Sequence, residues 1–205
     1  LCKLTENAFR DVNIAFANEL SMICDGLDIN PWELIHLANQ HPRVNVLKPG
    51  PGVGGHCIAV DPWFIVNTSP TKARLIRKTR EVNDAKPGHV VLQVKAMITD
   101  TNQPVIALLG LTYKADVDDL RQSPALEVVR TLAMEKLGRL LVVEPYLSSL
   151  PEDLTQYENV EKVDLDIALE RAEVVVLLVD HRQFSDLQPS KLKGFKLLNT
   201  CRGWQ

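Results

Sequence analysis

Helical spacing of apolar residues dominates the first hundred residues of the chain. Apolar side chains recur at three- and four-residue intervals over residues 3–25, which predicts a long amphipathic helix. A second helix is predicted to begin at Pro31, a favoured first-turn residue, and to end at the next His-Pro step. A third helical pattern covers residues 71–86, and it resumes as residues 89–98 beyond a Pro-Gly pair.

The hydrophobic pattern changes after residue 103, where short β-branched and leucine-rich runs alternate with helical segments. These runs cover residues 104–110, 138–145, 172–180 and 195–200. Because the runs are apolar throughout, they predict a parallel sheet that is buried on both faces. The helix between the first two runs has its own end signals, with Ser123 as cap, Pro124 in the first turn and Gly138 just past the end.

This change of pattern predicts an α/β protein with two domains. Residues 1–100 are expected to form a helical domain, and residues 101–205 are expected to form a Rossmann-like domain built on the parallel sheet. A chain of 205 residues, of which 45% are hydrophobic, is long enough for one large or two small cores.

Composition and charge exclude several classes of function. The net charge of −3, with both signs mixed along the chain, leaves no basic stripe for a nucleic acid. The longest apolar runs are strand-sized and too short for a membrane helix, and the first residues do not resemble a signal peptide. The 4 cysteines form no C-x-x-C pair, so no metal site or disulfide framework is predicted, and a reducing cytoplasm is the simplest setting.

The segment KPGPGVGGHCIAVDP, residues 48–62, contains the letters of a dinucleotide-binding loop, G-x-G-x-x-G. The context that such a loop needs is missing, because no predicted strand precedes the glycines and no acidic residue ends a strand about 20 positions later. Glycines also allow tight turns and a close approach of the backbone to a ligand. We therefore expect Gly54 and Gly55 to lie at a substrate and Cys57 to be presented as a nucleophile.

Polar residues around Cys57 fit an acyl-transfer site. Lys3 and Asn7 share one face of the first helix, and Asp61 follows Cys57 by one helical turn. A cation, an amide and a carboxylate have distinct tasks at a tetrahedral intermediate formed on a thiol. The alternative is that Cys57 is a small buried apolar residue, which is the usual fate of a lone cysteine. Spacing alone leaves both interpretations open.

Four stretches of the chain carry a family resemblance: KLTENAFRDVNIAFANEL, GVGGHCIAVDPWF, GLTYKADVDDLRQSP and VVEP. Together they resemble the central and C-terminal parts of the UDP-glucose/GDP-mannose dehydrogenase family. The NAD-binding domain with which the family's enzymes begin has no counterpart in this sequence, so the chain is expected to be a fragment of a longer enzyme. Val60 precedes Asp61 where relatives that oxidise UDP-glucose usually have Lys, and this favours UDP-N-acetyl-D-mannosamine as the substrate.

The resemblance implies a mechanism. The family transfers two hydrides to NAD from C6 of a nucleotide-linked sugar, taking the alcohol through an aldehyde to a carboxylate. Cys57 matches the family's nucleophile, which forms a thiohemiacetal and then a thioester. Lys3 and Asn7 match the pair that stabilises the C6 oxygen, and Asp61 matches the aspartate of the water or proton step. NAD is expected to bind mainly to the N-terminal domain outside this chain, which by itself is expected to be inactive.

The resemblance also implies residues that bind the UDP-sugar. Lys114 matches a lysine that binds substrate at the hinge between the two halves, and Arg121 is expected to support the nucleotide or its loop. Arg43 matches an arginine that reaches the sugar site of a neighbouring subunit; the alternative is a solvated loop charge. Arg202 keeps the basic residue of a C-terminal motif in which Thr200 replaces the usual aspartate.

Two further expectations concern partners and ligands. A homodimer joined through the first helix is expected, because Phe9 and Phe16 add apolar positions on more than one helix face. The α/β half is expected to hold the UDP-sugar and not NAD: Glu144 imitates a ribose-binding acid, but GLTYK has a single glycine. The alternative function is a stand-alone nucleotide-sugar-binding or dimerisation module without catalysis.

Overall fold

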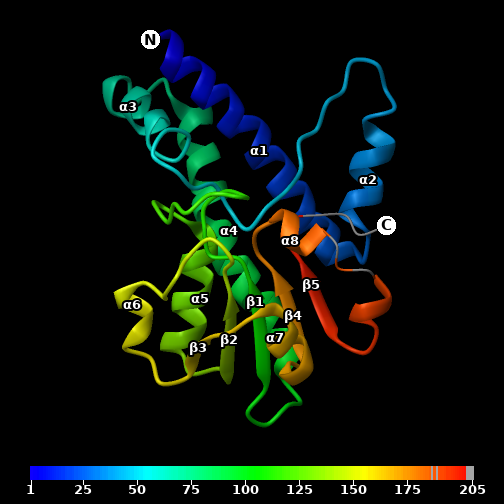
Figure 1. Ribbon diagram of the computed structural model, residues 1–205. Coiled ribbons are helices and arrows are strands. Elements are labelled where there is room, and N and C mark those ends of the chain that lie inside the picture. The colour runs from blue at the N-terminus through cyan, green and yellow to red at the C-terminus, as the bar shows by residue number, and fades with distance from the viewer. Residues whose placement is uncertain (186, 188, 202–205) are drawn as a thin grey trace.

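A group of helices lies over the carboxyl ends of a five-stranded parallel sheet (Figure 1). The computed structural model describes residues 1–185, 187 and 189–201. The helical part contains α1 (Cys2–Leu27), α2 (Pro31–Ala38), α3 (Asp61–Thr68) and α4 (Arg74–Ile98). Within the described residues, no helix combines the length and the apolar character needed to cross a bilayer.

The sheet has the strand order β3-β2-β1-β4-β5, and each neighbouring pair is parallel. Its strands are β1 (Val105–Leu109), β2 (Arg139–Val143), β3 (Val160–Lys162), β4 (Val174–Leu177) and β5 (Lys196–Asn199). The helices of this part are α5 (Pro124–Met134), α6 (Glu152–Thr155), α7 (Leu165–Arg171), α8 (Arg182–Ser185) and the 3-10 helix η1 (Pro189–Leu192). The α/β class is confirmed. The hydrophobic pattern misses β3, because its sequence VEK contains no apolar run.

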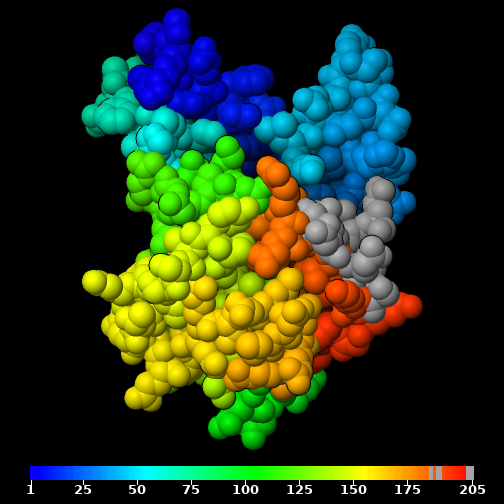
Figure 2. All heavy atoms as spheres, viewed as in Figure 1, coloured from blue at the N-terminus to red at the C-terminus, as the bar shows by residue number. Residues whose placement is uncertain are grey.

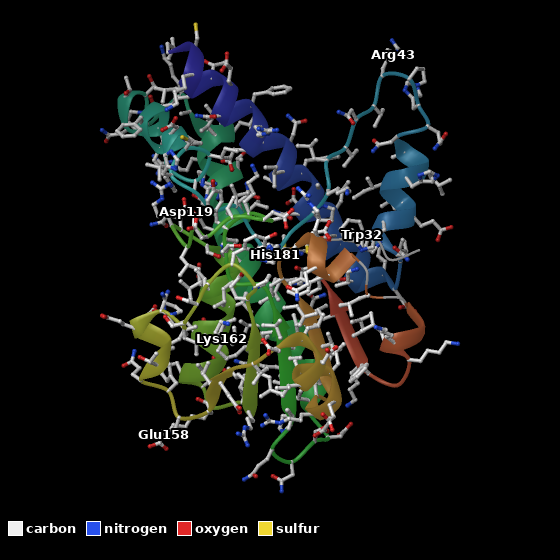
Figure 3. All side chains as sticks on the ribbon, in the orientation of Figure 1. Trp32, Arg43, Asp119, Glu158, Lys162 and His181 are labelled. Atoms are coloured by element: carbon white, nitrogen blue, oxygen red, sulfur yellow. The ribbon has the colours of Figure 1, made fainter. Side chains whose placement is uncertain are left out.

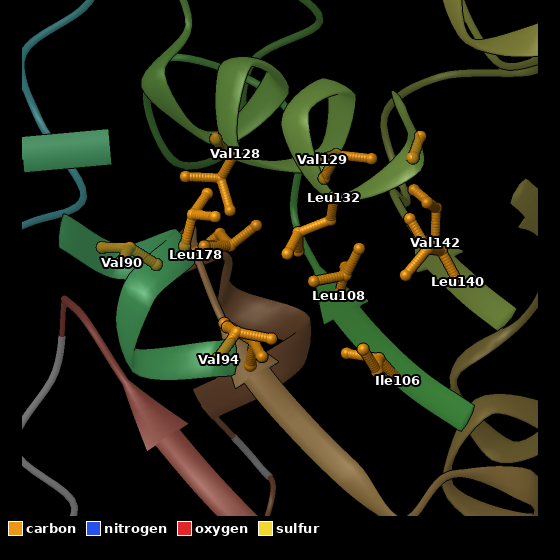
Figure 4. Close-up of a cluster of buried hydrophobic side chains, with 14 of the residues drawn as sticks. Val90, Val94, Ile106, Leu108, Val128, Val129, Leu132, Leu140, Val142 and Leu178 are labelled. Carbon is orange, nitrogen blue, oxygen red and sulfur yellow. The ribbon is translucent and has the colours of Figure 1, made fainter. Parts of the chain in front are cut away.

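Each face of the sheet has its own hydrophobic core. On one face, α5 and the second half of α4 cover Ile106 and Leu108 (Figure 4). On the other face, α7 and α8 cover Ala107 and Leu109. Successive strand residues point to opposite faces, so covering both faces explains why each strand reads as a continuous apolar run. Each fully buried Leu or Val side chain contributes about 1.5–3 kcal/mol to this core.

Helix α4 runs without interruption through Pro87, whereas the hydrophobic pattern predicts a break there. Proline lacks an N–H, and in a helix interior it costs about 3 kcal/mol. Contacts on both sides of the proline offset this cost. Arg80, before it, bonds to Asp11 of α1, and Val90 and Val94, after it, are buried against the sheet. A single helix therefore connects the helical part to the sheet.

Helix α5 begins as predicted, but a different residue ends it. The Ser123 hydroxyl accepts a hydrogen bond from the Leu126 N–H at 3.3 Å, the expected N-cap contact. After the helix, Lys136 takes the left-handed conformation (φ 53°) that the sequence pattern assigns to Gly138. Gly138 precedes β2, where a Cβ atom would lie 2.2 Å from the Pro104 carbonyl oxygen. The prediction for Gly138 is wrong, because glycine is required there by the close approach of two segments and by a φ of 135°, and not by the end of the helix.

Candidate active site

The glycine-rich segment forms an irregular loop that leads into α3, which we call the thiol loop (residues 48–60). The Gly50 N–H donates to the side-chain oxygen of Asn18 in α1 at 2.8 Å. The Gly55 N–H donates to the Arg121 carbonyl oxygen at 2.9 Å. The thiol loop is therefore fixed to the helical part at one end and to the β1–α5 loop (residues 110–123) at the other.

Gly54 and Gly55 pack against the β1–α5 loop so closely that a side chain would not fit. A Cβ atom at Gly54 would lie 2.5 Å from the Gln122 carbonyl oxygen and 2.7 Å from the Tyr113 Cβ. Gly55 has φ 84°, and its Cβ would lie 2.8 Å from the Tyr113 ring. The packing of the two loops accounts for both glycines. Their contact with a substrate stays a prediction.

Three of the residues predicted to be catalytic contact one another directly. The Asn7 side chain donates to Asp61 Oδ2 at 2.7 Å, and Lys3 Nζ lies 3.7 Å from the same oxygen. Lys3 and Asn7 lie one turn apart on α1, and the packing of α1 on α3 brings them to Asp61. Asp61 is buried, whereas the Lys3 side chain is 71% exposed. An exposed ion pair contributes at most about 1 kcal/mol, so Lys3 is held loosely.

Cys57 is connected to this cluster through the main chain. Its carbonyl oxygen accepts hydrogen bonds from the Val60 N–H at 3.1 Å and the Asp61 N–H at 2.7 Å, which form the turn that starts α3. Cys57 is partly exposed, whereas Cys24 is buried in the helical part. A nucleophilic thiol must be accessible to its substrate. Cys57 is therefore not the small buried residue of the alternative interpretation, and its role as a nucleophile stays a prediction.

A charged pair on the β1–α5 loop lies near the thiol loop (Figure 3). The Arg121 guanidinium donates to the Asp119 carboxylate, with Nε–Oδ1 at 3.0 Å and Nη2–Oδ2 at 2.6 Å. These bonds lower the pKa of Asp119 to about 2, and the charge of His56 acts in the same direction. Asp119 in turn raises the pKa of Arg121, mainly through these hydrogen bonds. Asp119 is not among the residues predicted from the sequence, although the Asp-x-Arg spacing on a loop is a signal for such a pair.

Two other residues predicted to bind substrate, Lys114 and Arg43, have exposed side chains. Lys114 is exposed on the β1–α5 loop. Arg43 is exposed at the tip of the segment after α2, far from Asp119 in Figure 3. Neither side chain forms a salt bridge with any residue that the structure describes. Arg202 lies outside the described residues, so its predicted role is neither supported nor contradicted.

The carboxylate that imitates a ribose-binding acid follows β2. Glu144, which imitates a ribose-binding acid in the sequence, is 1% exposed. Its Oε2 accepts hydrogen bonds from the Leu111 N–H at 2.7 Å and the Thr112 N–H at 3.2 Å, so the carboxylate is already used within the protein. Gly110 is the only glycine of the β1–α5 loop, so a cradle for a pyrophosphate is lacking. That NAD binds outside this chain stays a prediction. In the described part of the chain, no group of 3 or more His, Cys, Asp or Glu side chains could hold a metal ion.

Models of a known protein family match most of this chain. Residues 1–85 match the central domain of the UDP-glucose/GDP-mannose dehydrogenase family, and residues 107–200 match the UDP binding domain of that family. The matched segments contain α1, α2 and α3 with the Lys3, Asn7 and Asp61 cluster, and most of the parallel sheet. The chain belongs to the UDP-glucose/GDP-mannose dehydrogenase family.

Individual relatives are nucleotide-sugar dehydrogenases. The chain is 59% identical over 204 residues to an NDP-N-acetyl-D-galactosaminuronic acid dehydrogenase from Ralstonia solanacearum. It is 57% identical over 195 residues to a UDP-N-acetyl-D-mannosamine dehydrogenase from Campylobacter jejuni. These matches cover 100% and 95% of this chain but 48% of each relative, so the chain spans about half the length of the curated relatives. Among solved structures, a UDP-N-acetyl-mannosamine dehydrogenase from S. aureus has a TM-score of 0.82 at 41% identity, covering 98% of this chain and 46% of that one.

Proposed function

We propose that this chain is the substrate-binding and thiol-bearing part of an NAD-dependent nucleotide-sugar 6-dehydrogenase. The reaction proposed is oxidation of UDP-N-acetyl-D-mannosamine to UDP-N-acetyl-D-mannosaminuronate. The observation that carries the proposal is the direct contact of Lys3, Asn7 and Asp61 next to Cys57 in a chain of this family. NAD, which accepts the hydrides, is held by residues outside this chain, and the chain alone is inactive.

Cys57 is proposed to perform the covalent step. The first oxidation turns the C6 alcohol into an aldehyde. The Cys57 thiolate then adds to the aldehyde carbon, so that a C–S bond forms and the carbonyl electron pair moves to oxygen. A second oxidation at the same carbon gives a thioester. Water attacks the thioester, the C–S bond breaks, and the thiolate leaves with the carboxylate product released.

We propose that two side chains, Lys3 and Asn7, stabilise negative charge on the C6 oxygen in these steps. Asp61 is proposed to accept a proton. The Asn7 amide has a second N–H beside the one that it donates to Asp61, and the Lys3 ammonium is loosely held, so both can donate to the C6 oxygen. Removing one such donor typically costs about 10²–10³ in rate. Asp61, whose position is fixed by Asn7, is proposed to take the proton from the attacking water.

The nucleotide is proposed to bind at the β1–α5 loop. Lys114 is exposed there without a salt bridge to any described residue, and Arg121 is held in a fixed orientation by Asp119. Both cations are suited to the diphosphate of a UDP-sugar. Gly54 and Gly55 pack against this loop, and we propose that their backbone groups contact the substrate.

We also propose a separate role for each of the two domains of the chain. Residues 1–100 are proposed to form the dimerisation and catalytic-thiol domain, and residues 101–205 the nucleotide-sugar-binding domain of a cytoplasmic enzyme. Arg43 projects from the tip of the segment after α2, and we propose that it reaches the sugar site of the other subunit of a homodimer. Arg202 is proposed to contact substrate from the C-terminal end.

The choice of an N-acetylated sugar rests on Val60 and on the relatives. Val60, immediately before Asp61, is 37% exposed. It stands where UDP-glucose-oxidising relatives usually have a cation, so a different substrate or cofactor contact is expected at this position. The curated relatives above are named for N-acetylmannosamine and for N-acetylgalactosaminuronic acid. We propose the mannosamine substrate.

Turnover of the complete enzyme on a panel of UDP- and GDP-sugars, followed by NADH absorbance, tests this function. UDP-N-acetyl-D-mannosamine should yield two NADH per sugar, and UDP-glucose should react poorly. Preferential oxidation of UDP-glucose would contradict the sugar assignment. Binding of nucleotide sugars without any NADH formation would favour the alternative, a nucleotide-sugar-binding or dimerisation module.

Calorimetry on the 205-residue chain separates its two candidate ligands. UDP should bind, because Lys114 and Arg121 are in place. NAD should show no measurable affinity, because Glu144 is buried and occupied by main-chain donors. Tight binding of NAD to this chain would overturn the assignment of the α/β half to the nucleotide sugar.

A further inference from the structure

A buried Glu–His pair connects the carboxyl ends of β2 and β4 below the β1–α5 loop. Glu144 follows β2 and His181 lies shortly after β4, and both side chains are 0% exposed. His181 Nε2 lies 3.1 Å from Glu144 Oε2. Figure 3 shows His181 near the centre of the molecule, where the sheet meets the helical part. Neither side chain can reach a substrate, so the pair has no part in the chemistry proposed above.

The hydrogen bonds of His181 define its tautomer. The Asp116 N–H donates to Nδ1 at 3.0 Å, so Nδ1 is the acceptor. Nε2 therefore carries the ring hydrogen and donates it to Glu144. Burial opposes ionisation of Glu144, but the bonds from His181 and from the Leu111 and Tyr146 N–H groups outweigh it and hold the pKa of this carboxyl below its usual range. A neutral imidazole and a charged carboxylate thus form one buried unit.

This unit holds residues 111–116 of the β1–α5 loop at both ends. Glu144 accepts the two main-chain N–H groups at the start of the stretch, and His181 accepts the Asp116 N–H at its end. Lys114, the proposed nucleotide contact, lies between these two anchor points. The position of its side chain therefore depends on a stretch of main chain that the Glu–His unit fixes.

The backbone of Asp116, at the end of residues 111–116, has an unfavourable conformation, and several contacts surround it. Asp116 has φ 59°, a left-handed conformation that is unfavourable for residues with a Cβ. Its carboxylate accepts bonds from the Tyr146 hydroxyl at 2.8 Å and the Arg182 N–H at 3.0 Å. The Thr112 hydroxyl donates to the Lys114 carbonyl oxygen at 2.9 Å. The His181 bond is the contact that supports the main chain of Asp116 itself.

We propose that His181 is a positioning residue for the nucleotide. By accepting the Asp116 N–H while it donates to Glu144, His181 sets the conformation in which Lys114 meets the diphosphate. This inference rests on the proposed function, because it takes Lys114 as a nucleotide contact. Loss of the Asp116 bond changes the affinity for nucleotide and raises KM, and it leaves the thiol chemistry and kcat unchanged.

Two conservative substitutions separate the two hydrogen bonds of His181. His181→Asn places an amide oxygen near the position of Nδ1 and keeps an acceptor for the Asp116 N–H. His181→Gln places an amide nitrogen near the position of Nε2 and keeps the donor to Glu144. Phe184→Leu is the matched control, since the buried Phe184 ring packs edge-on against His181 at a centroid distance of 5.4 Å and makes no hydrogen bond to the loop.

Calorimetric titration of the 205-residue chain and its variants with UDP, together with thermal unfolding, tests the proposal. His181→Gln should weaken UDP binding about five- to tenfold, the effect of one lost hydrogen bond. His181→Asn should bind within about twofold of wild type, and Phe184→Leu should lower the melting temperature without changing UDP affinity. In the complete enzyme, His181→Gln should raise KM for the UDP-sugar by a similar factor at constant kcat.

Several results would overturn the inference. Equal UDP affinity in all variants would show that the loop does not depend on His181. If UDP affinity fell in step with melting temperature in every variant, including Phe184→Leu, His181 would have only a structural role. Retained binding in His181→Gln with loss in His181→Asn would assign the effect to Glu144 alone. If the wild-type chain itself failed to bind UDP, the proposed nucleotide site would be wrong, and the inference would fall with it.

Discussion

Lys86 of α4 is a buried cation whose hydrogen-bond partner is neutral. The residue is 4% exposed, and its Nζ donates to the Ser21 hydroxyl at 2.7 Å. Burial lowers the pKa of Lys86 to about 8, and the charge of Asp25 compensates for part of that effect. A hydroxyl does not replace the hydration that an ammonium loses, so the charged form destabilises the fold. The side chain borders a cavity of about 400 Å³ between α1, α4 and β5.

The stability of the chain should therefore depend on pH through Lys86. The pKa in the folded state, about 8, is below the value of 10.5 for an unperturbed lysine, so between these two values the unfolded chain binds the proton more strongly. The free energy of unfolding should rise with pH across this window, and the full penalty should be present below it. Lys86→Met should unfold with a free energy roughly 2 kcal/mol higher than wild type near neutral pH. That difference should shrink in alkaline buffer.

Urea unfolding of wild type and Lys86→Met in neutral and alkaline buffer measures this effect. Lys78→Met is the control, because Lys78 is 75% exposed and forms a surface pair with Glu81. Its effect should stay within about 1 kcal/mol at each pH. A Lys86→Met difference that stays constant with pH would show that the buried amine does not titrate as expected.

Cys57 should be indispensable for formation of the acid in the complete enzyme. Cys57→Ser should bind nucleotide sugar nearly as wild type, because the proposed nucleotide contacts lie on the β1–α5 loop. Production of the uronate should fall roughly 10³-fold or more, since a hydroxyl is a poorer nucleophile than a thiolate and an ester is less suited than a thioester to the next step. The exposed Cys2 provides the control, and Cys2→Ser should leave turnover unchanged.

Mass spectrometry can detect the covalent intermediate directly. Asp61→Asn should slow hydrolysis of the thioester, so a sugar adduct should accumulate on Cys57. The proposed mechanism would be wrong if Cys57→Ser still made the uronic acid at the wild-type rate with two NADH per sugar. The thiol loop would then be a structural turn beside an unreactive cysteine.

At the scale of elements, the two loops act as one packed unit on which α3 begins. The thiol loop contacts the β1–α5 loop through glycine backbone, and its last turn leads into α3, the helix that carries Asp61. The geometry of the site therefore depends on how closely these loops pack. Replacing a glycine within a helix should have the opposite effect on stability, because such a glycine weakens the helix without allowing a close contact.

Gly54→Ala and Gly88→Ala form a matched pair that tests this difference. Gly54→Ala should lower the free energy of unfolding by about 1–3 kcal/mol, because the new Cβ meets main-chain atoms that cannot move aside. Gly88 lies within α4 with nothing within 4 Å of an added Cβ. Gly88→Ala should raise the free energy of unfolding by about 0.5–1 kcal/mol. Denaturant unfolding measures both, and equal effects of the two substitutions would contradict the packing argument.

At the scale of the whole molecule, the outer face of α1 has no partner within the described chain. Phe9, Phe16 and Ile23 are 71%, 53% and 52% exposed, and they recur every seventh residue along α1. A groove of about 570 Å³ lies between α1 and the segment around Leu47, in the notch at the top of Figure 2. Asn7 of the proposed catalytic cluster also lines this groove, so a second subunit bound there would lie next to the proposed site.

The chain should therefore be a dimer joined mainly through α1. Sedimentation at micromolar concentration should give a dimer, and Phe16→Glu should give a monomer because it places a charge on the apolar face. Met134→Glu changes a residue that is 62% exposed on α5, and as a control it should leave the dimer intact. A monodisperse wild-type monomer would count against the interface and would remove the basis for Arg43 acting across it.

The sequence alone was sufficient for those features that depend on local periodicity. The spacing of apolar residues predicted α1 and α2, and the apolar runs predicted four strands of the sheet and with them the α/β class. The Ser123 cap was also correct, because a helix start depends on residues within one turn. Lys3 and Asn7 could be placed on one helix face for the same reason.

Only the tertiary structure decided features that depend on contacts between distant segments. Helix α4 continues through Pro87 because α1 and the sheet bury its two halves, and no local signal records that burial. Asp61 meets Asn7, 54 residues away in sequence, because α1 packs on α3. Glu144, an apparent ribose ligand, is instead occupied by main-chain N–H groups of a neighbouring loop. Local sequence fixes which conformations each segment favours, whereas packing free energy and hydrogen-bond satisfaction across the fold select the partner of each polar group.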